Sequence, residues 1–396
     1  YDINDIFPLT NLYFNGRLCY APKNYDLYIS QRFGDYMKFP PIDKRIPHEG
    51  KSHAMIPCKH KESLTFIPKK KYNICICGGG NISHALSGTL AYKGHTINIL
   101  SRQPEKWQKK IKVNNPELEY YGIISKVSND PKDVIPDCEL IIISVPVFGI
   151  DDILNKIRPY LTEKMSIIGI PGRLYSQFNQ DLDHINQIYL ARTPYISRID
   201  SYGSGVSITG YCYKELNYWS NDFEKGEKIL NNLFSFKVKK IHNLDSINLV
   251  NSNTILHPSR LYSLFKDKKE YTYKPLFYGE WDLESSKILI ECDHELQKLI
   301  IAINNDKIEN KVYVKTILEH YDCKDCIELT HKIQNIDSLS KIYLHLIEKE
   351  GKYYCDYKSR YITEDIFIGM KYVIDLANKY NINIPKIKEI YKMFTT

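Results

Sequence analysis

The sequence predicts an α/β protein, in which a doubly wound parallel sheet is followed by a mostly helical region. Three observations predict this fold class. Short apolar runs alternate with helical patterns from residue 71 to about residue 244. The run Glu139–Val145 is continuously apolar, as expected of a strand that is covered on both faces of a parallel sheet. From Asp245 onward, apolar residues recur at helical spacing, and strand-like runs are few.

Residues 1–70 are an N-terminal extension without a sustained period of either 2 or 3.6 residues. Its many aromatic residues argue against ordinary disorder. We expect the extension to pack on the body of the protein or on a partner subunit, such as a second copy in a homodimer. The sequence assigns it no function.

The region 71–244 opens with a strand, a glycine turn, a helix and a second strand. The strands are predicted at Asn73–Cys77 and Thr96–Leu100, and the helix at Ser83–Lys93. This order is typical of a βαβ (Rossmann) unit that binds a dinucleotide. Glycines let the backbone approach a pyrophosphate, and free amides at the helix start hold its charge.

The predicted pyrophosphate loop consists of Gly78, Gly79, Gly80, Asn81, Ile82 and Ser83. The third position of the G-x-G-x-x-G pattern is Ser83 rather than glycine, so the pattern is not fully met. A plain turn between strand and helix is the alternative interpretation.

The end of the second strand indicates which nucleotide is bound. Sites that prefer NAD usually carry Asp or Glu there, but this chain has Ser101 and Arg102. Three lysines follow, on what we expect to be a short helix: Lys106, Lys109 and Lys110. A hydroxyl and a cation can bind a 2′-phosphate, which favours NADP(H) over NAD(H). A solvated basic loop is the alternative.

The remaining strands complete the predicted sheet. The strand Glu139–Val145 ends at Ser144, Val145 and Pro146, which we place at the carboxyl edge, near the nicotinamide ribose. A helix is predicted at Gly149–Tyr160. Further strands are predicted at Gly122–Val127, Met165–Ile170, Gln187–Ala191, Gly205–Gly210 and Lys237–Ile241.

Residues 245–396 form the predicted helical domain. Helical spacing covers Asp245–Leu256, Leu283–Asn304, Val312–His320, Ser338–Lys349 and Glu364–Tyr380. Within it, Asn253 and His257 lie four residues apart on one helix face, and Pro258 is expected to distort or end that helix. The imidazole would then face the cleft between the domains, or simply interact with the last carbonyls.

A second group of polar residues lies near the C-terminus. Thr363 is a plausible N-cap, followed by Glu364 and Asp365 in the first turn of an amphipathic helix. From the pattern alone, the helix dipole explains both acidic residues, and Arg360 before the cap can be an ordinary surface residue.

Three motifs together resemble the opine dehydrogenase family. They are GGGN after the first strand, NSNTILHPSRLY at 251–262 and SRYITEDI at 359–366. The resemblance implies a Rossmann domain, a helical domain, and an NAD(P)H-dependent condensation of an amino acid with a 2-oxo acid. It assigns a catalytic role to His257, a partner role to Asp365 and carboxylate binding to Arg360. We expect Asn253 to orient the nicotinamide amide or the substrate.

The chain departs from the family pattern in three places. The extension 1–70 is not part of the family core, the region 303–346 is longer than in compact members, and Phe367 stands where relatives often carry proline. None of these removes a proposed catalytic group. Two other functions stay open: a single-substrate reductase of the ketopantoate type, and a non-catalytic NADPH-binding sensor or interaction protein.

Composition limits the other classes. The net charge is +7, and no basic stripe is interleaved with aromatics, so nucleic-acid binding is not supported. No apolar run reaches the length of a membrane helix. The ten cysteines are scattered, which predicts free thiols in a cytoplasmic protein. The pair Cys323 and Cys326 has no matching second pair, so no metal site is predicted.

Overall fold

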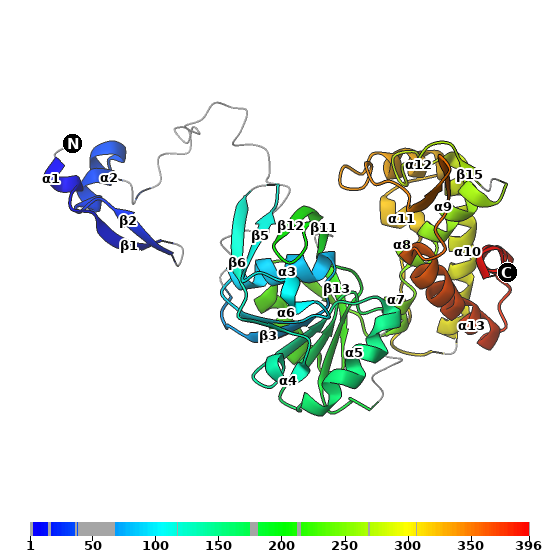
Figure 1. Ribbon diagram of the computed structural model, residues 1–396, viewed down its shortest axis with the longest axis horizontal. Helices are drawn as coiled ribbons and strands as arrows, with labels where there is room; N and C mark the ends of the chain where they lie inside the picture. Colours follow the sequence, from blue (N-terminus) through cyan, green and yellow to red (C-terminus); the bar gives the residue numbers. More distant parts are fainter. Residues whose placement is uncertain are drawn as a thin grey trace. The chain divides into compact units, whose positions relative to one another are not determined.

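The computed structural model describes residues 3–14, 17–35, 38, 68–116, 118–174, 181–211, 215–267, 270–305 and 307–395. The chain forms two compact units, Tyr1–Lys69 and Lys70–Thr396 (Figure 1). In the first unit, β1 (Thr10–Phe14) and β2 (Arg17–Ala21) pair as an antiparallel hairpin beside the helices α1 (Ile3–Ile6) and α2 (Tyr25–Phe33). Most of the rest of the predicted extension lies outside the described residues.

The second unit is built around an eight-stranded sheet with the order β14-β13-β10-β9-β8-β3-β4-β7. Six neighbouring strands of this sheet are parallel: β7, β4, β3, β8, β9 and β10. The next strand, β13, runs antiparallel to β10. Their bounds are β3 (Asn73–Cys77), β4 (Thr96–Leu100), β7 (Lys126–Ser128), β8 (Leu140–Ile143), β9 (Ser166–Gly169), β10 (Asn186–Leu190), β13 (Glu215–Ser220) and β14 (Lys237–Lys240). The order is that of the doubly wound dinucleotide-binding fold, so the predicted fold class is confirmed.

Helices cover both faces of this sheet. Figure 1 shows α3 (Asn81–Tyr92) and α6 (Phe223–Leu233) over one face, and α4 (Pro131–Val134) and α5 (Ile150–Ile157) over the other. The central strands are apolar on both faces because both are covered: all four residues of β8 are buried. The strand order switches between β3 and β8, because β4 and β7 extend the sheet on one side of β3 and β8, β9 and β10 extend it on the other. Ligands of such sheets bind at the carboxyl ends of the two strands at this switch point.

A second sheet lies against α3, and sequence analysis did not predict it. Its order is β11-β12-β5-β6, with bounds β11 (Tyr195–Ser201), β12 (Gly205–Tyr211), β5 (Lys110–Asn114) and β6 (Glu119–Ile123). Three predictions fail here. The strand predicted at Gly205–Gly210 forms as β12, but in this second sheet rather than in the parallel one. The strand predicted at Gly122–Val127 is the end of β6 plus β7, in different sheets. The short helix predicted near Lys106–Lys110 is a single turn, Pro104–Lys106, followed by β5, because Ile111 and Val113 alternate with exposed or half-exposed polar residues.

The C-terminal part is mostly helical. Its helices are α7 (Asp245–Asn248), α8 (Asn251–Thr254), α9 (Leu256–Phe265), α10 (Leu283–Asn305), α11 (Ile317–Tyr321), α12 (Cys326–Gln334), the π-helix η6 (Tyr361–Met370), α13 (Lys371–Lys379) and α14 (Pro385–Thr395). The long helix α10 places Leu289, Cys292, Leu296 and Leu299 in the core of this part. A boundary at residue 244 stays a prediction, because Lys70–Thr396 form one unit.

Several predicted helices differ in the structure. Asp245–Leu256 is divided into α7, α8 and the start of α9, and only residues from Ile317 onward are helical in Val312–His320. The segment Ser338–Lys349 is not a helix. It ends in β16 (Leu346–Lys349), which pairs with β17 (Lys352–Cys355) and, through it, with β15 (Glu270–Tyr271). The end of this segment has the two-residue period of a strand. Ile342, Leu344 and Leu346 are less exposed than the residues between them.

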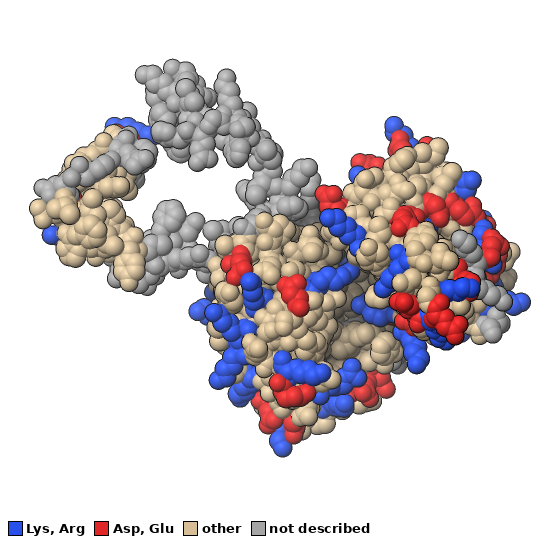
Figure 2. Space-filling view, turned by 45° about the horizontal axis from the view of Figure 1, so that its top comes forward, with Lys and Arg blue, Asp and Glu red and all other residues tan. Residues whose placement is uncertain are grey.

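Two surface properties bear on function. No helix in the described part of the chain is both long and apolar enough to cross a membrane. On the face shown in Figure 2, basic and acidic side chains are interspersed, and no continuous basic stripe crosses it.

A buried histidine between α3 and β4 makes stability depend on pH. His95 is only 4 % exposed, its Nδ1 accepts a hydrogen bond from the Tyr72 amide (3.1 Å), and its Nε2 has no partner among the described residues. Burial, followed by the charges of Lys93 and Lys71, lowers its pKa to about 4. Below about pH 6.5, His95 is therefore protonated in the unfolded chain but stays neutral in the folded chain until the pH approaches 4.

Because of this histidine, we expect the unfolding free energy to be about 2 kcal/mol lower at pH 5 than at pH 7. Urea unfolding at both values would measure the loss. The variant His95→Gln should show a flatter dependence on pH, whereas His294→Gln, at an exposed position, should keep that of the wild type. Equal pH dependence in His95→Gln and the wild type would contradict the assignment.

Candidate active site

The loop after β3 has the geometry of a phosphate cradle. Gly78 has φ +137°, and a Cβ there would lie 2.5 Å from the Ser144 carbonyl oxygen, so the position admits only glycine. Gly80 is the N-cap of α3, and a Cβ on it would meet nothing within 4 Å. The first-turn amides, those of Asn81, Ile82 and Ser83, lack intrahelical acceptors. The loop therefore fits a pyrophosphate.

The helix that carries this loop is tied down by its own side chains. Asn81 accepts a hydrogen bond from the Ile199 amide at 2.9 Å, and the Ser83 hydroxyl donates to the Ser144 carbonyl at 3.4 Å. Ser144 directly follows β8, so its contact with Ser83 links the end of β8 to the loop after β3. Val145 and Pro146 come next and lead into the turn η3 (Val147–Gly149) and α5. Ser144 thus lies beside the glycine turn, and the proximity of all three residues to the nicotinamide ribose stays a prediction.

Aromatic side chains surround the end of β4, and no pattern in the sequence predicted them. Ser101 is 5 % exposed, and its hydroxyl oxygen accepts hydrogen bonds from the Trp107 indole nitrogen (3.1 Å) and from the Gln103 amide (3.3 Å). Trp107 stacks on His84 with ring centroids 4.2 Å apart. The Tyr202 hydroxyl would lie 2.5 Å from a Cβ on Gly79. Arg102 is exposed, as are Lys106, Lys109 and Lys110.

His257 lies at the start of a helix rather than at its end, which corrects the prediction. Helix α9 begins at Leu256, and Pro258 occupies its first turn, where the missing amide hydrogen costs nothing. Asn253 belongs to the separate helix α8 and is exposed. Asn253 and His257 therefore do not share a helix face as predicted, because Ile255 separates the two helices.

The imidazole of His257 has a partner on each nitrogen. Its Nδ1 is 2.8 Å from Asp365 Oδ2, and its Nε2 is 2.8 Å from the Tyr278 hydroxyl. The side chain is buried, with the Tyr361 ring centroid 4.4 Å from its own. A carboxylate only accepts hydrogen bonds, so Nδ1 carries the proton and Nε2 accepts from Tyr278. Burial raises the pKa of the Tyr278 hydroxyl well above its usual value.

Asp365 lies on the π-helix η6, and the predicted cap before it is wrong. The helical turn begins at Tyr361, and the Thr363 hydroxyl donates to the Ser359 carbonyl instead of capping. Asp365 is 5 % exposed and hydrogen-bonded to His257, so the helix dipole alone does not explain it. π-Helical turns frequently occur at functional sites.

The neighbouring Glu364 is buried as well, and it connects η6 to the sheet. It accepts hydrogen bonds from Arg360 Nε (3.2 Å) and from the Val147 backbone amide that follows β8. Burial raises its pKa. The Arg360 side chain itself is 68 % exposed, so its guanidinium remains accessible to a ligand.

A buried cation beside Asp365, Arg173, was not predicted. It follows β9 and the Pro171–Gly172 turn, and its Nη1 lies 3.8 Å from Asp365 Oδ1. Its Nε has no partner among the described residues. A Cβ on Gly369 would lie 2.0 Å from Arg173 Nη2, so this glycine makes room for the guanidinium. The position of Arg173, at the carboxyl edge of the sheet, was the available signal in the sequence.

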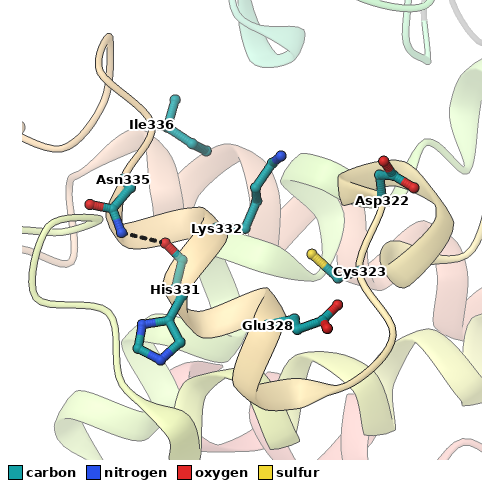
Figure 3. Close-up of a pocket in the computed structure, with 7 residues that line it drawn as sticks. All are labelled: Asp322, Cys323, Glu328, His331, Lys332, Asn335 and Ile336. Carbon is teal, nitrogen blue, oxygen red and sulfur yellow. Dashed lines mark hydrogen bonds between the residues drawn. The ribbon is translucent and has the colours of Figure 1, made fainter.

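A surface hollow on the C-terminal part lies apart from these residues. Figure 3 shows it beside α12, where it has a volume of about 640 Å³ and is open to solvent. Its lining includes Cys323, Glu328, His331 and Lys332. It contains none of the predicted site residues. Cys323 and Cys326 are free thiols, and no group of metal-binding side chains occurs among the described residues.

Comparison with protein families matches both parts of the chain. Residues 240–396 match the α-helical domain of NAD/NADP octopine/nopaline dehydrogenases, and residues 73–170 match coenzyme F420-dependent NADP oxidoreductases. The chain is 24% identical over 351 residues to octopine dehydrogenase of Pecten maximus, covering 79% of this chain and 86% of the relative. It is 24% identical over 363 residues to opine dehydrogenase of Haliotis discus hannai, covering 81% and 89%.

The fold is also similar to a solved structure. Octopine dehydrogenase with NADH and L-arginine has a TM-score of 0.69 and 23% identity, over 81% of this chain and 88% of that chain. The sequence matches span both the dinucleotide-binding part and the helical part. These comparisons support the assignment of the chain to the opine dehydrogenase family of NAD(P)-dependent oxidoreductases.

Proposed function

We propose that this protein condenses the amine of an amino acid with a 2-oxo acid and reduces the product with NADPH to an N-(carboxyalkyl) amino acid. The observation that carries the proposal is the buried His257–Asp365 hydrogen bond of 2.8 Å, formed by residues 108 positions apart in the sequence. A histidine oriented by a carboxylate is suited to general acid–base work near neutral pH. The amine must lose a proton before it attacks the oxo carbon, and the adduct must then lose water.

Each step uses a group of this chain. His257 takes the proton of the substrate ammonium and returns one for the loss of water. Asp365 holds the imidazole tautomer and stabilises the imidazolium. The exposed guanidinium of Arg360 can bind a substrate carboxylate through two parallel hydrogen bonds. The loop 78–83 would hold the pyrophosphate of NADPH, which supplies a hydride when bound. Asn253 is exposed on α8, and we assign it no step.

The preference for NADPH rests on Ser101 and Arg102. The Ser101 oxygen accepts two hydrogen bonds, and no acceptor among the described residues takes its proton. That proton is therefore available to an oxygen of the ligand, and a 2′-phosphate offers oxygens that accept hydrogen bonds. Arg102 adds an exposed cation, and neither of the two residues directly after β4 is a carboxylate that would repel the phosphate. The octopine dehydrogenase used for comparison holds NADH, so this preference is proposed for this chain alone.

The proposed reaction is tested by following NADPH oxidation at 340 nm with amino acids crossed against 2-oxo acids. Each single component serves as its own control. Oxidation that requires both components supports the proposal, and the best pair identifies the substrates. Oxidation with the oxo acid alone would indicate a single-substrate reductase of the ketopantoate type. No oxidation with any pair, together with tight NADPH binding, would indicate a sensor or interaction protein.

Reversing the charge of Arg102 tests the cofactor preference. We expect Arg102→Glu to weaken NADPH binding about tenfold or more relative to NADH, because a carboxylate would repel the 2′-phosphate. Fluorescence titration with both nucleotides measures the ratio. Lys164→Glu makes the same charge change at an exposed position before β9, at the opposite edge of the sheet, and should leave the ratio unchanged. An unchanged ratio in Arg102→Glu would refute the assignment.

A further inference from the structure

The Tyr278 hydroxyl occupies the side of His257 that a substrate would need. With Nδ1–H bound to Asp365, the only basic atom of the imidazole is Nε2, and it accepts the Tyr278 hydrogen bond at 2.8 Å. Neither nitrogen is then left for a substrate amine. A proton can reach His257 only if Tyr278 moves away or if Tyr278 passes the proton on.

The loop that carries Tyr278 is fixed to the helix that carries His257. Arg260, one turn after His257, is 1 % exposed and donates to the carbonyls on either side of Tyr278, those of Phe277 (3.2 Å) and Glu280. The same guanidinium also binds Asp282 at 2.7 Å.

The opposite side of the loop is equally constrained. The Phe277 amide donates to the Ile342 carbonyl at 2.7 Å, and a Cβ on Gly279 would lie 2.3 Å from the Ser340 carbonyl oxygen. Moving the backbone of this loop away from His257 would break these buried hydrogen bonds and leave their groups unpaired. This arrangement favours transfer through Tyr278 over its displacement.

We propose that Tyr278 carries protons between the substrate and His257, so that the path runs from substrate to Tyr278 to His257. The inference rests on the proposed function. The substrate ammonium gives a proton to the Tyr278 oxygen while the Tyr278 proton moves to His257 Nε2. The products are a neutral amine, an unchanged tyrosine and an imidazolium that Asp365 stabilises. The loss of water uses the same path in reverse.

The two transfers must be concerted, because the tyrosine is ill suited to ionise. Tyr278 is 7 % exposed, and burial is the main cause that raises its pKa, followed by Tyr361, Tyr321 and Asp365. Arg198 acts in the opposite direction. A free phenolate at this position would be unstable, whereas a tyrosine that loses and gains a proton together carries no charge.

The test compares Tyr278→Phe, His257→Ala and the double variant, each assayed with the best substrate pair. We expect Tyr278→Phe to lower kcat about 30-fold or more, with unchanged NADPH binding. The kcat of the double variant should lie within about threefold of that of His257→Ala. When two residues act as one catalytic unit, removing either one already removes the contribution of both. Tyr271→Phe is the matched control, since its hydroxyl makes a buried hydrogen bond to the Leu264 carbonyl at 2.9 Å. It should keep kcat within about twofold.

Three outcomes would overturn the inference. Full activity in Tyr278→Phe would mean that His257 contacts the substrate directly. Losses that multiply in the double variant would mean that Tyr278 acts independently of His257. If Tyr278→Phe does not fold, 3-fluorotyrosine at position 278 keeps the ring and the hydroxyl but changes its acidity, and an unchanged kcat would then refute the relay. Full activity in His257→Ala would instead refute the proposed function.

Discussion

Replacing His257 by alanine is expected to lower kcat about 100-fold or more, while NADPH binding is retained. The imidazole is the only described group that combines a neutral-pH base with a buried carboxylate partner, here Asp365 at 2.8 Å. General acid–base catalysis usually contributes two to four orders of magnitude, that is about 10²–10⁴-fold. His257 lies in the first turn of α9, whereas the nucleotide loop lies between β3 and α3, so binding of the cofactor should not depend on the imidazole. Steady-state kinetics and fluorescence titration of the same preparation measure both effects.

The control for this variant is His331→Ala. His331 is exposed on α12 and lines the hollow in Figure 3, away from the proposed site residues. Its replacement should change kcat by less than about twofold. If His257→Ala keeps full activity, or if both variants lose activity equally, the assignment of the general base is wrong.

Sequence patterns predicted the nucleotide-binding part well where local and tertiary signals agree. The strands Asn73–Cys77 and Thr96–Leu100 have the predicted bounds, because each apolar run is enclosed by glycine or polar residues. Both are interior strands of the sheet, where burial on two faces produces continuous apolar runs. The glycine turn between them needs backbone freedom that few residues allow.

The second sheet shows why the remaining strands were missed or misplaced. In β6 the buried residues are Tyr120 and Gly122, and the strand packs on α3 through Gly122, whose Cβ would lie 2.3 Å from the Gly88 carbonyl oxygen. A short alternating strand with tyrosine and glycine on its inner face gives only a weak hydrophobic signal. Its position depends on the packing of α3, which no local pattern reveals.

The candidate site was predictable only in part, for a similar reason. Pro258 is compatible with either the first turn or the end of a helix, and the wrong alternative was predicted. The pairing of His257 with Asp365 was implied by family resemblance rather than by spacing. Tyr278 and Arg173 reach the site from a loop and from a strand end, and neither residue belongs to a motif. Their roles depend on contacts made only in the folded chain.

Arg173 joins the sheet to the helical part, and its removal should affect stability more than that of any surface ion pair. The guanidinium is buried between the end of β9 and η6, 3.8 Å from Asp365. Burial lowers its pKa, and the opposing charges of Asp365 and Glu364 favour the charged form. Breaking a buried pair leaves the remaining charge without compensation, which typically costs 3–5 kcal/mol.

We expect Arg173→Leu to lose about 3 kcal/mol of unfolding free energy, toward the lower end because Asp365 keeps its bond to His257. Urea unfolding at pH 7.5 measures the loss. Gly369→Ala tests the same contact from the other side, because its Cβ would lie 2.0 Å from Arg173 Nη2 and must displace the guanidinium. Lys112→Ala removes an exposed pair with Glu119 and should cost far less than Arg173→Leu. If Arg173→Leu and Lys112→Ala lose equally little, the buried ion pair does not stabilise the contact between sheet and helices. A large loss in both Arg173→Leu and Gly369→Ala would instead make this contact the element that holds Asp365 in place for His257.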